Sequence, residues 1–238
     1  MLGSPNVTAE PAKAAHRRRP LHSPWMHVLL ALVVVSLVQG FLVKVYTVPS
    51  GSMELTLAVG DRLLVNRTVY TSTAPQRGDV VVFRKSEEWG PAPHRSPLRM
   101  AIGWFGELTG IGPANTEYVV KRVAGLPGDT VECCDVTGKV MVNGLAVDEP
   151  YIFQDLPFIG GTTDCSTPVR SPRCFGPILL DEDQYLLLGD HRSNSEDSVS
   201  ACRSVGSPAG CVKTVGRADI IGRVDGFVFP FGKWGERP

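Results

Sequence analysis

The stretch Val48-Pro49-Ser50-Gly51-Ser52-Met53-Glu54-Leu55-Thr56-Leu57 begins a few residues after a lone hydrophobic run. Proline, glycine and serine together are typical of a turn between regular elements. The sequence therefore predicts a turn that carries serine hydroxyls at a membrane surface, where the folded domain begins.

The hydrophobic run extends from Trp25 to Val43 and contains no Lys, Arg, Asp or Glu. A helix of this length, at about 1.5 Å per residue, roughly crosses the ~30 Å hydrocarbon core of a bilayer. Basic side chains outnumber acidic ones in residues 1–24, and positively charged flanks stay in the cytoplasm. We therefore predict a cytoplasmic basic arm at 1–24, a transmembrane anchor at 25–43 and an extracytoplasmic domain at 44–238. This arrangement describes a single-pass protein of the plasma membrane in contact with the lipid bilayer.

A cleavable secretory signal is the alternative interpretation of this run. The run is longer than the apolar part of a typical signal, and no small-x-small cleavage site follows it. Cleavage there would also leave Ser50 and Ser52 near a free N-terminus. We therefore favour the anchor.

Composition limits the size of the domain and the class of partner that the chain is expected to bind. At 238 residues, 43% of them hydrophobic, the chain supports one substantial domain beyond the anchor. The 24 Lys and Arg residues balance the 24 Asp and Glu residues, so the overall charge does not indicate a nucleic-acid partner.

Short segments of β-branched and apolar residues, bounded by Gly, Asp, Asn or Pro, predict an all-β domain. The Asn143-Gly144 pair is typical of a tight hairpin. Two segments, near 85–117 and 155–183, have the composition of insertions. The apolar patch around Trp104 and Phe105 in the first of them predicts either ordinary packing or contact with a membrane surface. The predicted strands are 61–66, 78–83, 118–123, 130–134, 139–142, 184–188 and 220–224.

All six cysteines follow the anchor, as expected in an oxidising compartment. The pairs Cys165/Cys174 and Cys202/Cys211 each enclose a loop rich in Pro, Gly and Ser, and we predict a local disulfide in each. Cys133 and Cys134 are adjacent in a predicted strand, where a bond between them would demand a distorted backbone. Zinc binding is the alternative use of these cysteines, but no CxxC pair or histidine cluster supports it, so we expect no metal.

Two further segments complete a pattern with Val48–Leu57. Lys121-Arg122-Val123 opens the pattern Lys-Arg-Val-x-Gly-x-Pro-Gly-Asp, and Gly189–Ser198 reads Gly-Asp-x-Arg-x-Asn-Ser-x-Asp-Ser. In this order after an anchor, the three segments resemble the signature boxes of bacterial type I signal peptidases, and the resemblance covers about residues 25–230. It implies a membrane-anchored serine endopeptidase of the serine/lysine type that cleaves N-terminal signal peptides from exported preproteins after small-x-small (Ala-x-Ala) sites.

The resemblance also implies the fold and the cofactor requirement. The fold is mainly β, a signal-peptidase-type domain of coiled antiparallel sheets preceded by one transmembrane helix. A smaller subdomain is inserted between Lys121 and the last box. No cofactor is needed.

The same resemblance assigns roles to single residues. Ser52 is the nucleophile and Lys121 the general base. Ser50 joins the Ser52 backbone N–H in the oxyanion hole, Ser195 orients the lysine ammonium, and Asp197 is a supporting carboxylate. The positions expected to line shallow apolar substrate pockets are Tyr46, Val48, Met53, Leu57, Leu63 and Val120.

A lysine base also agrees with the positions of the five histidines. His16, His22 and His27 lie before or inside the anchor, and His94 lies in the first insertion. His191 lies in the last box, where the family pattern gives it no catalytic role. Burial in an apolar strand lowers the pKa of lysine and so provides a neutral amine.

Two positions depart from the family pattern. Leu55 replaces a proline that is usual after Ser-x-Ser-Met-x, which we expect to loosen the turn. Val199 replaces a common arginine after Asp-Ser, so the partner of Asp197 is left open between Arg122, Arg192 and Arg203.

Two other functions remain alternatives. A self-cleaving serine/lysine protease of the repressor type shares the dyad but would not require an export-oriented anchor. A catalytically silent, membrane-tethered binding domain would not require Ser52 and Lys121 in matching boxes.

Overall fold

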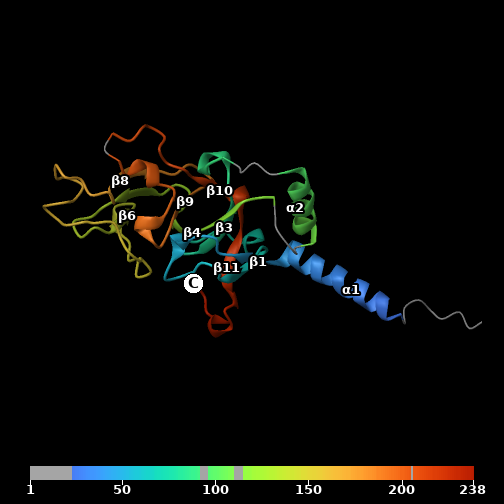
Figure 1. The fold of residues 1–238 in the computed structure, drawn as a ribbon. Helices are drawn as coiled ribbons and strands as arrows, with labels where there is room; N and C mark the ends of the chain where they lie inside the picture. Colours follow the sequence, from blue (N-terminus) through green and yellow to red (C-terminus); the bar gives the residue numbers. More distant parts are fainter. Residues whose placement is uncertain (1–22, 92–95, 110–114, 205) are drawn as a thin grey trace, which may run out of the picture. The chain divides into compact units, whose positions relative to one another are not determined.

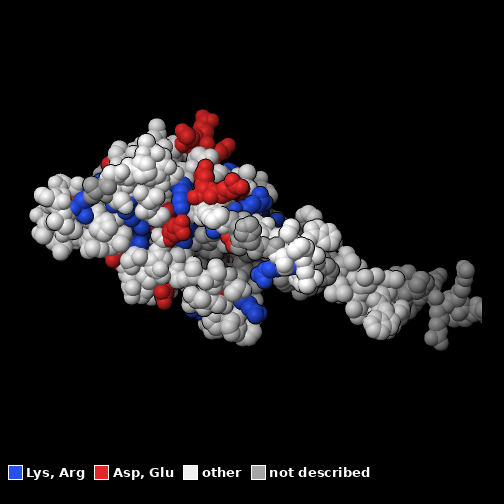
Figure 2. Space-filling view, turned by 45° about the horizontal axis from the view of Figure 1, so that its top comes forward, with Lys and Arg blue, Asp and Glu red and all other residues white. Residues whose placement is uncertain are grey.

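The computed structural model describes residues 23–91, 96–109, 115–204 and 206–238. The chain divides into two compact units, Met1–Val35 and Ser36–Pro238. After Ser23, the described part of the first unit belongs to helix α1 (Pro24–Leu37), and the apolar helix continues through the π-helical turn η2 (Val38–Leu42). Figure 2 shows the surface of the helix without charged side chains. Among the described residues, Pro24–Leu42 is the one helix long and apolar enough to cross a membrane.

The larger sheet of the second unit has seven strands in the order β1-β2-β11-β3-β4-β9-β10, and every neighbouring pair is antiparallel. Val43, the last residue of the predicted anchor, is the first residue of β1. The strands are β1 (Val43–Thr47), β2 (Arg62–Asn66), β3 (Val80–Arg84), β4 (Tyr118–Gly125), β9 (Gln184–Leu188), β10 (Val215–Gly216) and β11 (Ile220–Phe229).

A smaller antiparallel sheet is built from the chain between β4 and β9, as expected for a subdomain inserted between Lys121 and the last box. Its strands, in spatial order, are β7 (Leu145–Ala146), β6 (Val140–Val142), β5 (Thr130–Cys133) and β8 (Phe175–Leu179). The Asn143-Gly144 pair connects β6 to β7 with positive φ at both residues, which confirms the predicted tight turn. Figure 1 shows β6 and β8 grouped at one end of the domain.

The large sheet is covered on both faces at its centre. In β3, Val80 and Val82 belong to one apolar cluster, whereas Val81 and Phe83 belong to another. This division follows from the period of two along a strand, which directs successive side chains to opposite faces. The mainly β fold with two antiparallel sheets and one N-terminal apolar helix is therefore as predicted.

Besides the strands, the described part of the second unit contains helix α2 (Pro97–Thr109), inside the segment interpreted as the first insertion. Strand β8 lies inside the second such segment. Short 3-10 turns connect the strands: η3 (Gly51–Met53), η4 (Val69–Thr71), η5 (Glu87–Trp89), η6 (Arg192–Asn194), η7 (Ser200–Cys202), η8 (Arg217–Asp219) and η9 (Phe231–Lys233).

Three disulfides join the six cysteines. Cys165–Cys174 and Cys202–Cys211 are formed, which confirms both predicted local loops. The structure also joins Cys133 to Cys134, a pair whose state the sequence left open. Strand β5 ends at Cys133, so Cys134 lies outside the strand, and the Cys133–Cys134 peptide bond is cis.

Candidate functional site

Ser52 lies at the centre of turn η3 and is buried, at 7% exposure. Its carbonyl oxygen accepts a hydrogen bond from the backbone N–H of His191, at 3.1 Å, which ties the turn to the last box. Leu55, just after the turn, has a φ of 75° that a proline ring cannot adopt. The departure at Leu55 therefore changes the exit from the turn, while Ser52 and Met53 stay buried.

Lys121 lies near the middle of β4, opposite Val81 of β3. Its side chain is on the same face of the strand as Val119 and Val123 and is only 2% exposed. The Lys121 Nζ atom donates a hydrogen bond to the Ser52 Oγ atom at 2.5 Å. The fold thus brings together two side chains that are far apart in the sequence.

The environment of Lys121 favours its neutral form. Burial lowers the pKa of the Lys121 ammonium to about 8, while the charges of Asp197, Asp190 and Glu196 act in the opposite direction. Desolvation is the larger effect because the amine has almost no contact with solvent. Lys121 can therefore accept a proton near neutral pH much more readily than a surface lysine.

Ser50 and Ser195 flank this pair. The Ser50 hydroxyl donates to Ser52 Oγ at 3.5 Å, at the long limit for a hydrogen bond. The Ser195 Oγ atom is buried and has no hydrogen-bond partner among the described residues. A Cβ atom added to Gly189 would lie 2.2 Å from Ser195 Oγ and 2.6 Å from the Ser52 carbonyl oxygen. Gly189 therefore allows the last box to approach the serine turn closely.

Asp197 is fully buried. Among the described residues, no hydrogen bond joins its carboxylate to Ser52 or Lys121. Its carboxylate accepts from the backbone N–H groups of Gly189 and Val199, at 3.4 and 3.3 Å. It also pairs with Arg203, at 3.1 Å. Arg203 thus supplies the cation that Val199 cannot, and the question left open by the sequence is answered.

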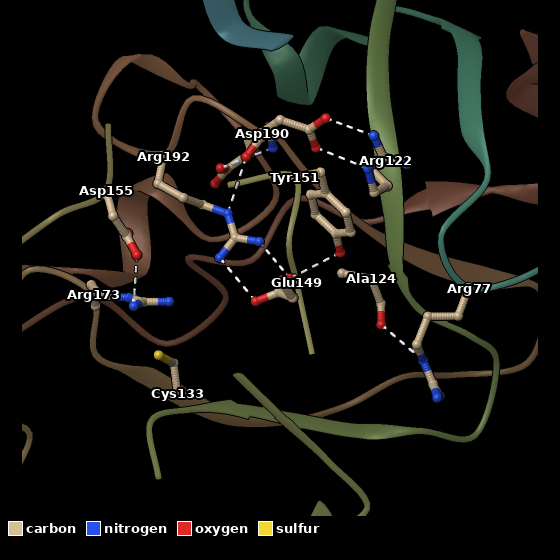
Figure 3. Close-up of polar contacts among 12 residues, drawn as sticks. Arg77, Arg122, Ala124, Cys133, Glu149, Tyr151, Asp155, Arg173, Asp190 and Arg192 are labelled. Carbon is tan, nitrogen blue, oxygen red and sulfur yellow. Dashed lines mark hydrogen bonds and ion pairs between the residues drawn. The ribbon is translucent and has the colours of Figure 1, made fainter. Parts of the chain in front are cut away.

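The other two arginines belong to a buried ionic network beside the site (Figure 3). Arg122 binds both carboxylate oxygens of Asp190, at 2.9 and 2.7 Å, and its guanidinium lies over the ring of Tyr151. Arg192 pairs with Glu149 at 2.5 Å.

Asp190 was missed as a site residue in the sequence, although it lies in a quoted box. It also accepts a hydrogen bond from the Thr56 hydroxyl, at 2.6 Å. The Asp190 carboxylate, which belongs to the last box, thereby connects two other segments: the strand of Lys121, through Arg122, and the segment after Ser52, through Thr56. Two features of the sequence could have indicated Asp190. It directly follows Gly189 in the last box, and the arginine directly after Lys121 is a cation with which it can pair.

A groove of about 770 Å³ opens beside the serine and lysine. Its walls include Pro49, Ser50, Tyr118, Val119 and Ser195, together with Ser52 and Lys121. The six predicted pocket residues gather in one apolar cluster rather than on these walls. Val48, Met53, Leu57, Leu63 and Val120 are buried members of that cluster, and Tyr46 packs against it.

The ring nitrogens of His191 contact groups other than the serine hydroxyl. Its Nδ1 atom lies 3.2 Å from the Gly51 carbonyl oxygen and 3.2 Å from Glu54 Oε2, and its Nε2 atom lies 3.2 Å from Gln154 Oε1. Both ring nitrogens are therefore engaged elsewhere. His94 lies outside the described residues.

Three cysteine sulfur atoms lie close enough together to share a metal ion, but their disulfide bonds prevent them from acting as ligands. The sulfur atoms of Cys134, Cys165 and Cys174 lie within 4.8 Å of one another. All three are bonded in disulfides, whereas metal ligation requires free thiolates.

Comparison with known proteins identifies the family of the chain. The family model described as "Signal peptidase, peptidase S26" matches residues 23–229. The chain belongs to this family. The chain is 32% identical to signal peptidase I of Mycobacterium tuberculosis (strain CDC 1551 / Oshkosh), over 96% of this chain and 78% of that protein. It is 31% identical to signal peptidase I of Leptolyngbya laminosa, over 82% of this chain and 80% of that protein.

A solved structure of a signal peptidase I from Enterococcus faecalis V583 is 25% identical and covers 64% of this chain and 97% of its own. Its TM-score of 0.33 is too low to support an argument about the fold. The family match and the relatives show that the chain is a protease of the signal peptidase class, a serine endopeptidase that acts on signal peptides of secreted preproteins. This result disfavours both alternatives, the repressor-type protease and the silent binding domain.

Proposed function

We propose that this member of the signal peptidase family uses Ser52 and Lys121 as a catalytic dyad. Its substrates are exported preproteins, from which it removes N-terminal signal peptides after small-x-small (Ala-x-Ala) sites. The observation that carries the proposal is the 2.5 Å hydrogen bond between Lys121 Nζ and Ser52 Oγ in a buried environment. Nucleophile and base within hydrogen-bond reach are the geometric requirement for this chemistry.

The reaction begins with neutral Lys121, which takes the proton of Ser52 as the Oγ atom attacks the scissile carbonyl carbon. The resulting oxyanion accepts hydrogen bonds from the Ser52 backbone N–H and the Ser50 hydroxyl. One donor of this kind contributes about 3 to 4 kcal/mol to transition-state stabilisation. The Lys121 ammonium then protonates the leaving amine, and a water molecule deprotonated by Lys121 hydrolyses the acyl-enzyme.

Burial of Lys121 makes this proton transfer accessible near neutral pH. With a pKa of about 8, roughly one molecule in ten holds a neutral Lys121 at pH 7. An unperturbed lysine would be neutral in only about one molecule in 2,500. Ser195 is the residue proposed to orient the ammonium, and Asp197 supports the last box through Arg203.

The preprotein is proposed to bind as an extended strand along the start of β4, where Tyr118 and Val119 form part of the groove wall. Alternate side chains of a strand face the same side, so residues one and three places before the cut reach the enzyme together. Met53 directly follows Ser52 in the sequence, and Val120 directly precedes Lys121. Both residues belong to one apolar cluster. Five of the predicted pocket residues belong to that cluster and Tyr46 packs against it. We propose that these six residues, from behind the groove walls, shape the shallow pockets that select small side chains.

The membrane arrangement is also a proposal. The apolar helix Pro24–Leu42 is the proposed anchor in the plasma membrane. Residues 1–24 would lie in the cytoplasm because of their excess of basic side chains, and the domain at 44–238 would lie outside it.

The test is cleavage of one exported precursor by the purified full-length protein in detergent. Mass spectrometry of the products should place the cut after an Ala-x-Ala sequence for the wild type, and Ser52→Ala should give no cut product. The exposed Ser72→Ala variant is the matched control and should cleave like the wild type. Cleavage by a folded Ser52→Ala protein at the same bond would overturn the proposed nucleophile.

A further inference from the structure

Helix α2 presents its apolar side chains to the outside. Trp104 is 64% exposed and Leu98 is 72% exposed, and Met100 and Ile102 are also exposed. At about 100° per residue, these four side chains spread over about 200° of the helix circumference, and Gly103 and Gly106 fall in the remaining sector. A helix that packs on a protein core has the opposite orientation, with its apolar side buried.

The side of α2 that faces the protein is instead formed by glycine. Gly103 and Gly106, one turn apart, are both buried. A Cβ atom added to Gly103 would lie 2.1 Å from the Asn115 Oδ1 atom, and the Asn115 side-chain amide donates to the Met100 carbonyl oxygen at 2.8 Å. Close packing on the glycine side thus fixes which side of α2 remains exposed.

The position of α2 indicates what covers the exposed side. Helix α2 lies beside η2, the last turn of the apolar segment Pro24–Leu42 (Figure 1). Turn η2 is itself tied to the domain, because the Arg67 backbone N–H donates to the Leu42 carbonyl oxygen at 3.0 Å. The Arg67 guanidinium also donates to the Gly40 carbonyl oxygen. The apolar side of α2 therefore lies next to the point at which the chain leaves the proposed membrane span.

We propose that α2 is an interfacial helix that inserts the side chains of Leu98, Met100, Ile102 and Trp104 into the outer surface of the lipid bilayer. An amphipathic helix of this kind lies in the plane of the interface, and tryptophan favours the headgroup level. This second membrane contact would hold the domain at a fixed height and orientation above the lipid. The proposal rests on the proposed anchor, since a chain that does not enter a membrane would not bring α2 to one.

The experiment uses the full-length protein in phosphatidylcholine and phosphatidylglycerol vesicles that contain lipids brominated at shallow or deep acyl positions. The difference in emission between the wild type and Trp104→Phe isolates Trp104. Its emission should be blue-shifted and quenched, more strongly by shallow than by deep bromines, because interfacial helices penetrate only about 5 to 10 Å. Trp234→Phe removes another exposed tryptophan and should leave this quenched component in place.

A Trp104 emission that bromolipids do not quench would overturn the proposal. Emission that changes only when a precursor protein is added would also overturn it and would assign α2 to a protein partner. The Trp25→Phe difference spectrum reports the anchor separately, since Trp25 lies in α1. A quenched Trp25 with an unquenched Trp104 would reject the α2 contact alone, whereas an unquenched Trp25 would reject the anchor.

Precursor cleavage in detergent tests the catalytic proposal separately from the proposed membrane contact of α2. Trp104→Phe should cleave like the wild type there, because the described side chains of α2 neither line the groove nor bond to Ser52 or Lys121. A second variant, Leu98→Gln with Ile102→Gln, should reduce the quenching of Trp104 and shift its emission to longer wavelength. Unchanged quenching in this variant, with cleavage in detergent retained, would contradict insertion of the apolar side.

Discussion

Lys121 combines two opposing electrostatic effects at the scale of a single residue. Burial opposes the charged ammonium, whereas Asp197 and Asp190 favour it. Those two carboxylates are themselves paired with Arg203 and Arg122, which weakens their influence on the lysine. Desolvation therefore prevails, and the pKa of Lys121 falls to about 8.

This pKa predicts the pH dependence of cleavage. As the pH falls below about 8 the fraction of Lys121 that is neutral and able to act as a base shrinks, and above about 8 most of the amine is neutral. The kcat/KM value should therefore rise with pH through about 8 and follow a single deprotonation. Steady-state cleavage of a precursor peptide across this range measures the profile. Ser50→Ala should lower the rate without moving the midpoint, and a profile that is flat on both sides of the midpoint would count against a lysine base.

Arg203 gives a second prediction at this scale. Its ion pair with Asp197 is largely buried, with the Asp197 side chain fully shielded from water. Arg203→Met would leave that charge unpaired, and we expect the free energy of unfolding to fall by about 3 to 5 kcal/mol. Urea denaturation measures the change. The exposed pair Arg84–Asp219 provides the control, because Arg84→Met should cost less than about 1 kcal/mol. Equal effects of the two substitutions would contradict the assigned role of Arg203.

Between elements, the close approach of the last box to turn η3 depends on Gly189, directly after β9. An added methyl group would overlap Ser195 Oγ and the Ser52 carbonyl oxygen. Gly189→Ala should therefore displace Ser52 from Lys121 and reduce kcat/KM by about 100-fold, since a shift of ~1 Å in a catalytic group has an effect of that size. Kinetics together with urea denaturation should separate lost activity from lost stability. Gly232→Ala, where an added methyl group meets no neighbour, is the control. An active Gly189→Ala enzyme would show that the turn tolerates the displacement.

The elements differ in how far the sequence predicts them. Runs of β-branched residues such as 78–83 and 118–123 correspond closely to β3 and β4. Strand β8 lies in a segment that was assigned to an insertion, and it contains Gly176 and Pro177, residue types that usually end strands. An edge strand tolerates proline, because one side of its backbone needs no hydrogen bonds to a neighbour, and β8 is at the edge of its sheet.

The site itself depends partly on tertiary contacts that spacing alone does not give. The sequence identified Ser52 and Lys121 as a pair because the motifs restrict their chemistry. It could not choose among three arginines for Asp197, because the choice depends on how the segment after η7 folds back. Helix α2 was missed because its glycines and the surrounding prolines obscure the helical period.

On the scale of the whole molecule, the charge asymmetry about the apolar helix predicts a defined topology. Protease added outside intact cells should digest the domain after Lys44 and leave a tag at the N-terminus protected. The physical reason is the excess of basic side chains before the apolar helix, which retains that end in the cytoplasm. Permeabilised cells provide the control, since the tag should then be digested. Digestion of the tag in intact cells would reverse the proposed orientation and move the site to the other side of the membrane.

The proposed dyad is tested most directly by the turnover of one exported precursor by Lys121→Arg. Arginine keeps the positive charge, but its guanidinium stays protonated and cannot accept the Ser52 proton near pH 7. The account predicts that a folded Lys121→Arg protein is as inactive as Lys121→Ala, with circular dichroism like that of the wild type. Substantial cleavage at the wild-type bond by a folded Lys121→Arg protein would contradict it.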